Sequence, residues 1–178
     1  MHEYSDMMTQ IFAYGEELRD FVDEYGLPEE WFAEPDHVAY KCRNAEHFDQ
    51  VMRFVADDAD NVSVAELDDR RLASAELNSP VYVESFGSVG WLEVMQPRPE
   101  NEGSDTVGLD HMEFYWPDFE GAEEILADRG ISYSLQGNSG HHSLTIVIND
   151  GGQELKLNDK RLADIVRGEL DEAEDYEF

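Results

Sequence analysis

The sequence predicts an α+β fold in which two βαβββ modules curl their strands into a cup. Two observations support this prediction. The order strand, helix, three strands occurs twice, and each copy opens with the same dipeptide, Asp36-His37 and Asp110-His111, 74 residues apart. A repeat of supersecondary order is a fold-level signal. Each sheet packs a helix on one face and must bury or use the other, so we expect the two sheets to enclose a cavity.

Composition indicates a folded, acidic protein. Of the 178 residues, 42 are acidic and 12 basic, which gives a formal charge of -30. This charge disfavours binding to nucleic acid, and no apolar run approaches the ~20 residues of a membrane helix. The single cysteine, Cys42, and the absence of a secretory pattern predict a cytoplasmic protein without a disulfide. The acidity fits either salt adaptation or solubility alone.

A single domain over residues 1–178 is expected to begin with a helix at 4–27. Its apolar residues recur at offsets of three, four and seven, and Gly26-Leu27-Pro28 ends it. The first module is expected at residues 36–97. Its elements are a strand at 37–42, a helix at 46–59, and strands at 62–67, 71–77 and 89–95, with residues 81–86 extending the third or the fourth strand.

The second module is expected at residues 108–158, after a Pro- and Gly-containing linker. Its elements are a strand at 109–116, a helix at 119–129, and strands at 131–135, 143–149 and 153–158. Residues 159–168 are expected to form a C-terminal helix. The acidic segment at 169–178 is interpreted as a mobile tail or, alternatively, as an interaction segment.

The period of two in a strand decides which side chains face the cavity. In each strand the apolar set should pack against the helices, which leaves the alternate set for the cavity. A lone strand histidine is usually a hydrogen-bonded core residue, but here histidines and carboxylates coincide. A divalent cation removes the cost of burying carboxylates and accepts neutral imidazoles as ligands. The predicted metal ligands, at matching strand positions, are His37, Glu93, His111 and Glu154.

Glu113, two residues beyond His111, is the candidate base or a residue that supports the ligands; alternatively, it pairs with a lysine. The chain has only three lysines, and two of them, Lys41 and Lys156, fall on the predicted cavity face. They suit an anionic substrate, or they simply neutralise the glutamates.

Other candidates have weaker support. Trp91 and Tyr115 fall on the cavity face and are candidate substrate contacts. His141 and His142 are expected in a solvated loop that could act as a lid. Cys42 is expected to be a buried, inert thiol.

These residues resemble the vicinal oxygen chelate (glyoxalase/bleomycin-resistance/dioxygenase) superfamily and, within it, the YecM-like proteins. The resemblance is carried by residues 36–42, 110–113 and 147–156, by the terminal helix and by the N-terminal helical extension. It implies a metal held in the cup by His37, His111 and carboxylates. A glyoxalase-like site would use both Glu93 and Glu154, whereas YecM-like proteins do not clearly carry a carboxylate on the eighth strand. With one carboxylate, the site is a triad that favours Fe(II).

The leading hypothesis is a metal-dependent enzyme of the vicinal oxygen chelate type. It would act on a small oxygenated, anionic metabolite by isomerase, lyase or dioxygenase chemistry, through an enolate or alkoxide stabilised by the metal. The alternative is a non-catalytic protein of the same fold that binds a small molecule; a third hypothesis is a scaffold for a protein partner. Nitrogen and oxygen ligands leave the metal open among Fe, Mn, Ni, Co and Zn. The sequence does not predict an oligomeric state.

Overall fold

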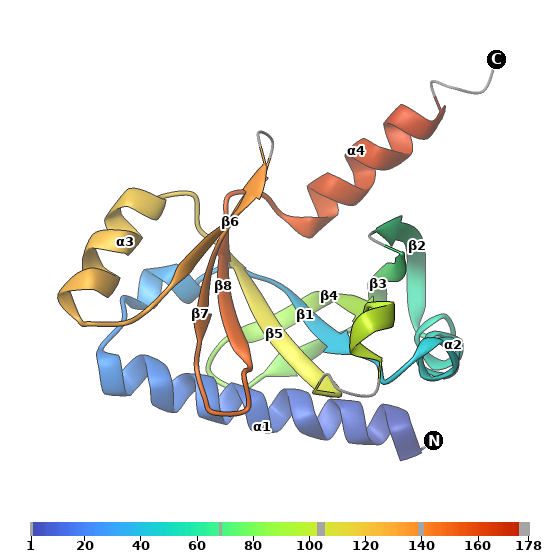
Figure 1. Cartoon of the computed structure of the whole chain (residues 1–178), viewed down its shortest axis with the longest axis horizontal. Helices are drawn as coiled ribbons and strands as arrows, with labels where there is room; N and C mark the ends of the chain where they lie inside the picture. The colour runs from blue at the N-terminus through green and yellow to red at the C-terminus, as the bar shows by residue number, and fades with distance from the viewer. Residues whose placement is uncertain (1, 68, 103–105, 139–140, 175–178) are drawn as a thin grey trace.

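The computed structural model describes residues 2–67, 69–102, 106–138 and 141–174. Within these residues, helices surround one eight-stranded mixed sheet with the strand order β2-β3-β4-β1-β5-β8-β7-β6. The sheet curls without closing, and α1 (His2–Tyr25) runs below it in Figure 1. No helix in the described part of the chain is both long and apolar enough to cross a membrane. The predicted α+β cup is confirmed.

The same element order occurs in both halves of the sheet. The first half contains β1 (Pro35–Lys41), α2 (Ala45–Val55), β2 (Ala59–Leu67), β3 (Arg70–Val83) and β4 (Gly87–Met95). The second half contains β5 (Gly108–Tyr115), α3 (Phe119–Asp128), β6 (Ser134–Asn138), β7 (His141–Val147) and β8 (Glu154–Asn158). The first strands, β1 and β5, pair antiparallel at the centre of the sheet. Each also pairs in parallel with the last strand of its own half.

Several predicted bounds in the first half are wrong. The helix predicted to Ala59 ends at Val55, because Ala59 already pairs with Leu77 at the start of β2. The third strand continues through residues 78–80, where a turn was expected. The pairing of β3 with β4 is interrupted between Glu76 and Val81, so Pro80 sits where no ladder hydrogen bond is needed from its nitrogen.

The second half and the C-terminus differ as well. His141 and His142 begin strand β7 and pair with Asn138 and Gly137 of β6, so the prediction that they lie in a loop is wrong. His142 is exposed to solvent, as expected. Strand β6 starts at Ser134, three residues later than expected. The C-terminal helix α4 (Leu162–Glu174) continues through residues 169–174, which were expected to be a mobile tail. This stretch contains mainly good helix formers, Glu, Leu and Ala. Residues 175–178 lie outside the described part.

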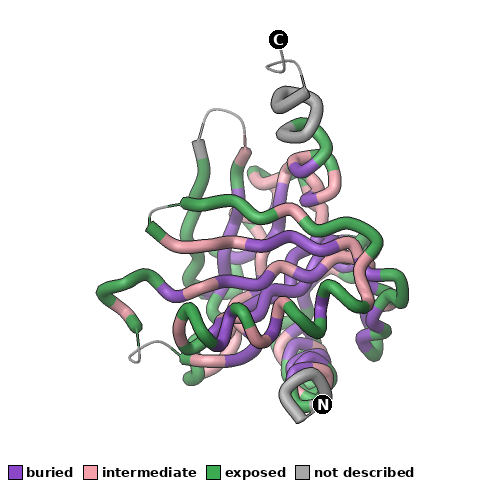
Figure 2. The backbone as a smooth tube through the Cα atoms, turned by 90° about the vertical axis from the view of Figure 1, so that its right-hand side faces the viewer, coloured by how far each residue is buried: buried purple, intermediate pink, exposed green. Residues whose placement is uncertain are grey.

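The core lies on the outer face of the sheet, where the helices pack, and Figure 2 shows burial concentrated along the central strands. Helix α1 buries an apolar stripe at Met7, Ile11, Tyr14, Leu18 and Val22. The Tyr14 hydroxyl donates to the Glu154 carbonyl at 2.6 Å and accepts from the Met112 amide at 3.3 Å, which joins the helix to β8 and β5. A Cβ atom at Gly15 would lie 2.6 Å from the Val83 side chain, so glycine allows this close approach.

The short 3-10 segments are η1 (Glu29–Phe32) and η2 (Pro99–Asn101). In η1, Trp31 and Phe32 are buried, and the Phe32 ring packs edge-on against Phe114 with ring centroids 5.1 Å apart. This aromatic contact packs η1 against β5. The opposite face of β5 therefore stays available for polar side chains.

Candidate metal centre

Two β-bulges in the central strand pair place the Asp-His dipeptides in equivalent positions. Pro35 pairs with Phe114 and His37 pairs with Glu113, so Asp36 is an extra residue on β1. A second register shift of the same pair makes Asp110 an extra residue on β5. A bulge changes the direction in which side chains project. Each aspartate can therefore lie beside the imidazole that follows it instead of pointing to the opposite face.

The bulges bring each carboxylate onto the neighbouring ring. Asp36 Oδ2 lies 2.9 Å from His37 Nδ1, and Asp110 Oδ2 lies 2.9 Å from His111 Nδ1. A carboxylate on Nδ1 fixes the ring orientation and places a proton on that nitrogen. Nε2 is then the nitrogen that each imidazole offers to the centre of the sheet.

Each aspartate has a second partner, and the two partners differ. The Leu162 amide at the start of α4 donates to Asp36 Oδ2 at 3.0 Å. Lys41 Nζ lies 2.7 Å from Asp110 Oδ1. Burial opposes ionisation of Asp110, but His111 and Lys41 outweigh burial and hold the pKa of this carboxyl well below its usual range. Lys41 therefore forms its ion pair with Asp110 and not with Glu113.

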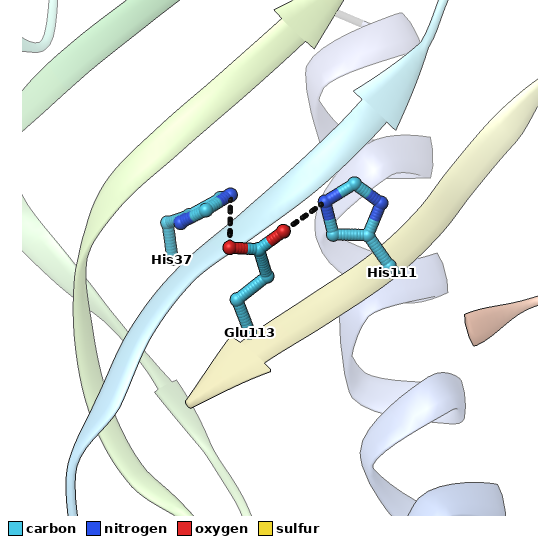
Figure 3. A group of neighbouring side chains, drawn as sticks. All are labelled: His37, His111 and Glu113. Carbon is cyan, nitrogen blue, oxygen red and sulfur yellow. Dashed lines mark ion pairs between the residues drawn. The ribbon is translucent and has the colours of Figure 1, made fainter. Parts of the chain in front are cut away.

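The Glu113 carboxylate lies between the two imidazoles, as Figure 3 shows. Its Oε2 atom is 3.6 Å from His37 Nε2, and its Oε1 atom is 3.3 Å from His111 Nε2. The rings are edge to face, with centroids 5.7 Å apart. The three residues are 3%, 1% and 7% exposed for His37, His111 and Glu113, so the group is shielded from solvent.

The electrostatics of this group favour opposite charges on its members. Burial lowers the pKa of His37, but Glu113, Asp36 and Glu93 outweigh burial and raise it to about 9. Burial raises the pKa of Glu113, but His37, His111 and Lys156 outweigh burial and keep it well below its usual range. His37 Nε2 nevertheless has no hydrogen-bond partner among the described residues. Buried polar atoms rarely lack a partner in native proteins, so this atom is a candidate ligand.

A cavity of about 900 Å³ opens onto the group. Small-molecule sites typically have volumes of roughly 300–1,000 Å³. His37, Glu93 and Glu113 line its wall together with polar residues of neighbouring strands, among them Ser74 and Asn158. Leu162 and Val166 of α4 line it from another side. The cavity therefore joins the ionisable group to a partly apolar surface.

The structure groups the predicted site residues differently from the predicted set of four metal ligands. His37, His111 and Glu113 have potential ligand atoms within 4.8 Å of one another; a second such group is Asp110, His111 and Glu154. Lys156 Nζ is 3.7 Å from Glu113 Oε1 and 3.6 Å from Glu154 Oε2. Glu113 thus occupies the central position, and Lys156 lies beside two carboxylates, as the neutralising interpretation expects.

Glu93 and Glu154 do not occupy matching strand positions, so that expectation is wrong. Trp91 is in register with His37, whereas Glu154 is in register with His111. Glu93 lies two residues beyond Trp91 on β4. The two-residue period gives the face of each strand but not the register between parallel strands, which explains the error.

None of the four predicted substrate contacts, Lys41, Trp91, Tyr115 and Lys156, is among the described residues that line the cavity. Trp91 is half-buried beside His37 in the register of the sheet. The Arg161 guanidinium lies 3.9 Å from the centroid of the Tyr115 ring, and Arg161 also pairs with Glu34. Sequence reasoning missed the role of Asp36 and Asp110. Their repetition before each histidine was a usable signal, but the bulges that aim them were not visible.

The family model described as "YecM protein" matches residues 3–139, and the chain belongs to this family. The predicted resemblance to the YecM-like proteins is confirmed.

Two solved structures show the same fold. One, described as "Structural Genomics, Protein EC4020", is 20% identical with a TM-score of 0.73, over 93% of this chain and 90% of that chain. Methylmalonyl-CoA epimerase from Mycobacterium tuberculosis is 14% identical with a TM-score of 0.51, over 75% of this chain and 91% of that chain. No curated protein matches the sequence. At these identities the likenesses show the fold alone.

Proposed function

We propose that this protein is a metal-dependent enzyme of the vicinal oxygen chelate type that acts on a small oxygenated, anionic metabolite. The observation that carries the proposal is the buried group of His37, His111 and Glu113, whose potential ligand atoms lie within 4.8 Å of one another. Both imidazoles are held through Nδ1 by an aspartate, an arrangement typical of metal-binding histidines.

The residues present fit a divalent cation. Two imidazole nitrogens and one carboxylate form a donor set that accepts Fe(II), and the same atom types accept Mn, Co, Ni and Zn. The unpartnered Nε2 atom of His37 supplies one donor. Glu113 is the carboxylate nearest to both rings, so we assign it as a ligand instead of a base. Glu154, grouped with His111, is the candidate for a further ligand.

When bound, the cation supplies a Lewis acid that stabilises negative charge on adjacent substrate oxygens. The protein contributes position and electrostatics. Lys156 attracts an anionic substrate. Leu162 and Val166 of α4 restrict water at the cavity wall, and Glu93, which lines the cavity from β4, is placed to exchange a proton with a bound substrate. Isomerase, lyase and dioxygenase chemistry all fit this arrangement.

One observation favours the alternative of a non-catalytic binding protein. The charges of the group are balanced internally, because the pKa shifts favour a protonated His37 beside an ionised Glu113. Lys156 adds a second cation at 3.7 Å from Glu113. Such a group needs no metal to stabilise its buried carboxylate, and the same cavity could hold a small molecule without chemistry.

Elemental analysis of protein purified without a histidine tag distinguishes the metal-dependent enzyme from the non-catalytic binding protein. Beside the wild type, the set comprises His37→Ala, Glu113→Gln, and the control His142→Gln, which removes an exposed histidine. The proposal predicts about one metal ion per chain in the wild type and control, and loss of the ion in the other two, because removing a ligand weakens binding strongly. No metal in the wild type after reconstitution with Fe(II), Mn(II), Co(II), Ni(II) and Zn(II) would support the binding-protein alternative.

A further inference from the structure

Buried polar atoms without a partner gather on one face of the sheet. In the described part of the chain, six buried side-chain atoms lack a hydrogen-bond partner. One is His37 Nε2, and three others are Ser143 Oγ, Thr145 Oγ1 and Asn158 Oδ1, all from β7 and β8. Native proteins seldom leave such atoms unpaired, because burying a polar group without a hydrogen bond is unfavourable. Their concentration beside the candidate metal centre therefore requires an explanation.

The register of the strands places these side chains together. Ser143 is paired with Asn158, and Thr145 is paired with Lys156. Lys156 is in turn paired with Glu113 on β5. Directly paired residues project from the same face of a sheet, so the block of four lies on the face that carries the candidate metal centre. Ser143, Thr145 and Asn158 are 8%, 4% and 2% exposed. Asn158 lines the cavity that opens onto the candidate metal centre, whereas Thr145 lines a second cavity of about 420 Å³.

The hydrogen-bonding chemistry of the block is complementary to two different groups of one ligand. Lys156 is a positively charged donor. Its contacts with Glu113, Glu154 and His111 Nε2 are long, at 3.7, 3.6 and 3.5 Å, so it can still donate to a ligand. The hydroxyls of Ser143 and Thr145 can donate or accept, whereas Asn158 Oδ1 can only accept. The cross-strand pair of Thr145 and Lys156 thus suits an anionic oxygen. The cross-strand pair of Ser143 and Asn158 suits a hydroxyl group.

We propose that Ser143, Thr145, Lys156 and Asn158 form a subsite for a small hydroxycarboxylate. The carboxylate binds Lys156 and Thr145, and the hydroxyl donates to Asn158 and accepts from Ser143. The proposal rests on the proposed function only in placing this ligand beside the metal. A trapped water molecule is the competing occupant, since water also uses several polar partners.

The test uses the full chain stripped of metal with a chelator, with glycolate as the probe. Acetate is the matched acid without the hydroxyl, and ethylene glycol is the matched alcohol without the carboxylate. Binding is followed through backbone amide shifts of β7 and β8 in NMR titrations. We expect glycolate to bind about tenfold more tightly than either control compound, because it alone can form hydrogen bonds with both cross-strand pairs. Equal binding of all three, or none by glycolate, would overturn the subsite.

Variants locate the binding. Thr145→Val and Ser143→Ala remove a hydroxyl with little change in shape, and each is expected to weaken glycolate binding about tenfold. Thr145→Ser should restore it, which shows that a loss in Thr145→Val is not misfolding. Ser74→Ala is the matched control, because Ser74 is also 8% exposed and lines the cavity from β3. Unchanged glycolate affinity in Thr145→Val and Ser143→Ala would assign the hydroxyls to trapped water and overturn the proposal.

The result is separable from that of the metal analysis. Glycolate binding without metal in a chain that also fails to take up metal would support the subsite and reject the metal-dependent enzyme. Metal uptake without glycolate binding, in either the stripped or the loaded chain, would reject the subsite and leave the proposed function standing.

Discussion

Asp36 and Asp110 each contact Nδ1 of the next histidine at 2.9 Å, and both are the extra residue of a bulge. An aspartate in a regular strand would point to the face opposite its neighbour. The bulge therefore converts a simple dipeptide into a pair in which the carboxylate orients the ring. The two modules repeat this device, which explains why both imidazoles present Nε2 to Glu113.

Asp36→Asn tests this role. The amide can still contact the ring but loses the charge, so we expect metal affinity to fall by about 10–100-fold with the fold retained. A chelator competition assay measures the loss. Asp164→Asn is the control, because Asp164 lines the cavity and no hydrogen bond or ion pair joins it to either histidine. Equal affinity in both variants would show that Asp36 does not orient His37.

The protonation of His37 gives a second prediction at this scale. In the metal-free chain its pKa is raised from 6.5 to about 9, because Glu113, Asp36 and Glu93 outweigh burial. A raised folded-state pKa means that the folded protein holds this proton more tightly than the unfolded chain. The stabilisation from His37 is therefore fully present below its ordinary pKa and is lost as pH rises through about 9.

An NMR titration of the imidazole checks this prediction. The midpoint should lie well above the ordinary value in the metal-free wild type and should fall in Glu113→Gln, which removes the charge that raises it most. A His37 midpoint at or below 6.5 would contradict the charged pair.

Helix α4 links the C-terminus to the site at the scale of elements. Its first residue, Leu162, donates its amide to Asp36 at 3.0 Å, and its side chain lines the cavity. Asp110, the equivalent residue of the second module, instead contacts Lys41. The orientation of His37 therefore depends on the docking of α4, whereas that of His111 depends on a lysine within the sheet.

Leu162→Pro separates the amide from the side chain. Proline is tolerated in the first turn of a helix but has no N–H to donate. We expect it to destabilise the protein by about 1.5–3 kcal/mol more than Leu162→Ala, because the lost bond has a charged acceptor. Denaturant unfolding measures the difference. If the two variants unfold at the same denaturant concentration, the contact between Leu162 and Asp36 contributes nothing to stability.

The sequence was informative about elements and less so about their register. Hydrophobic periodicity and the repeated dipeptide predicted the element order and placed His37, His111 and Glu113 on one face. Periodicity could not detect the bulges at Asp36 and Asp110, because each adds one residue without an apolar signature. Periodicity also cannot give the register between parallel strands that are far apart in the sequence. Only the structure shows that Glu154 is in register with His111, whereas Glu93 lies two residues beyond the position in register with His37.

At the scale of the whole molecule, the acidic surface and the central site have separate consequences. The formal charge is -30, with only 12 basic residues in 178. Acidic groups at this density repel one another, and salt screens the repulsion between exposed charges over a Debye length of ~10 Å at 0.1 M. The buried group at the β1–β5 pair is shielded from such screening.

We therefore expect salt to stabilise the fold. The unfolding temperature should rise as NaCl is increased from about 0.05 to 1 M, because the Debye length shortens to roughly 3 Å. Differential scanning calorimetry of the metal-free chain measures the change, with choline chloride as a second salt to separate screening from specific ion binding. A fall in unfolding temperature in both salts would show that attractive surface pairs outweigh the repulsion.

The proposed function requires a divalent metal between His37, His111 and Glu113. A crystal structure of the manganese- or zinc-loaded protein, with anomalous scattering recorded at the metal edge, tests it most directly. We expect one strong anomalous peak roughly 2.0–2.3 Å from Nε2 of both histidines and from a Glu113 oxygen. A peak held only by Asp110, His111 and Glu154, or by His141, His142 and Asp159, or no peak in the loaded protein, would contradict it.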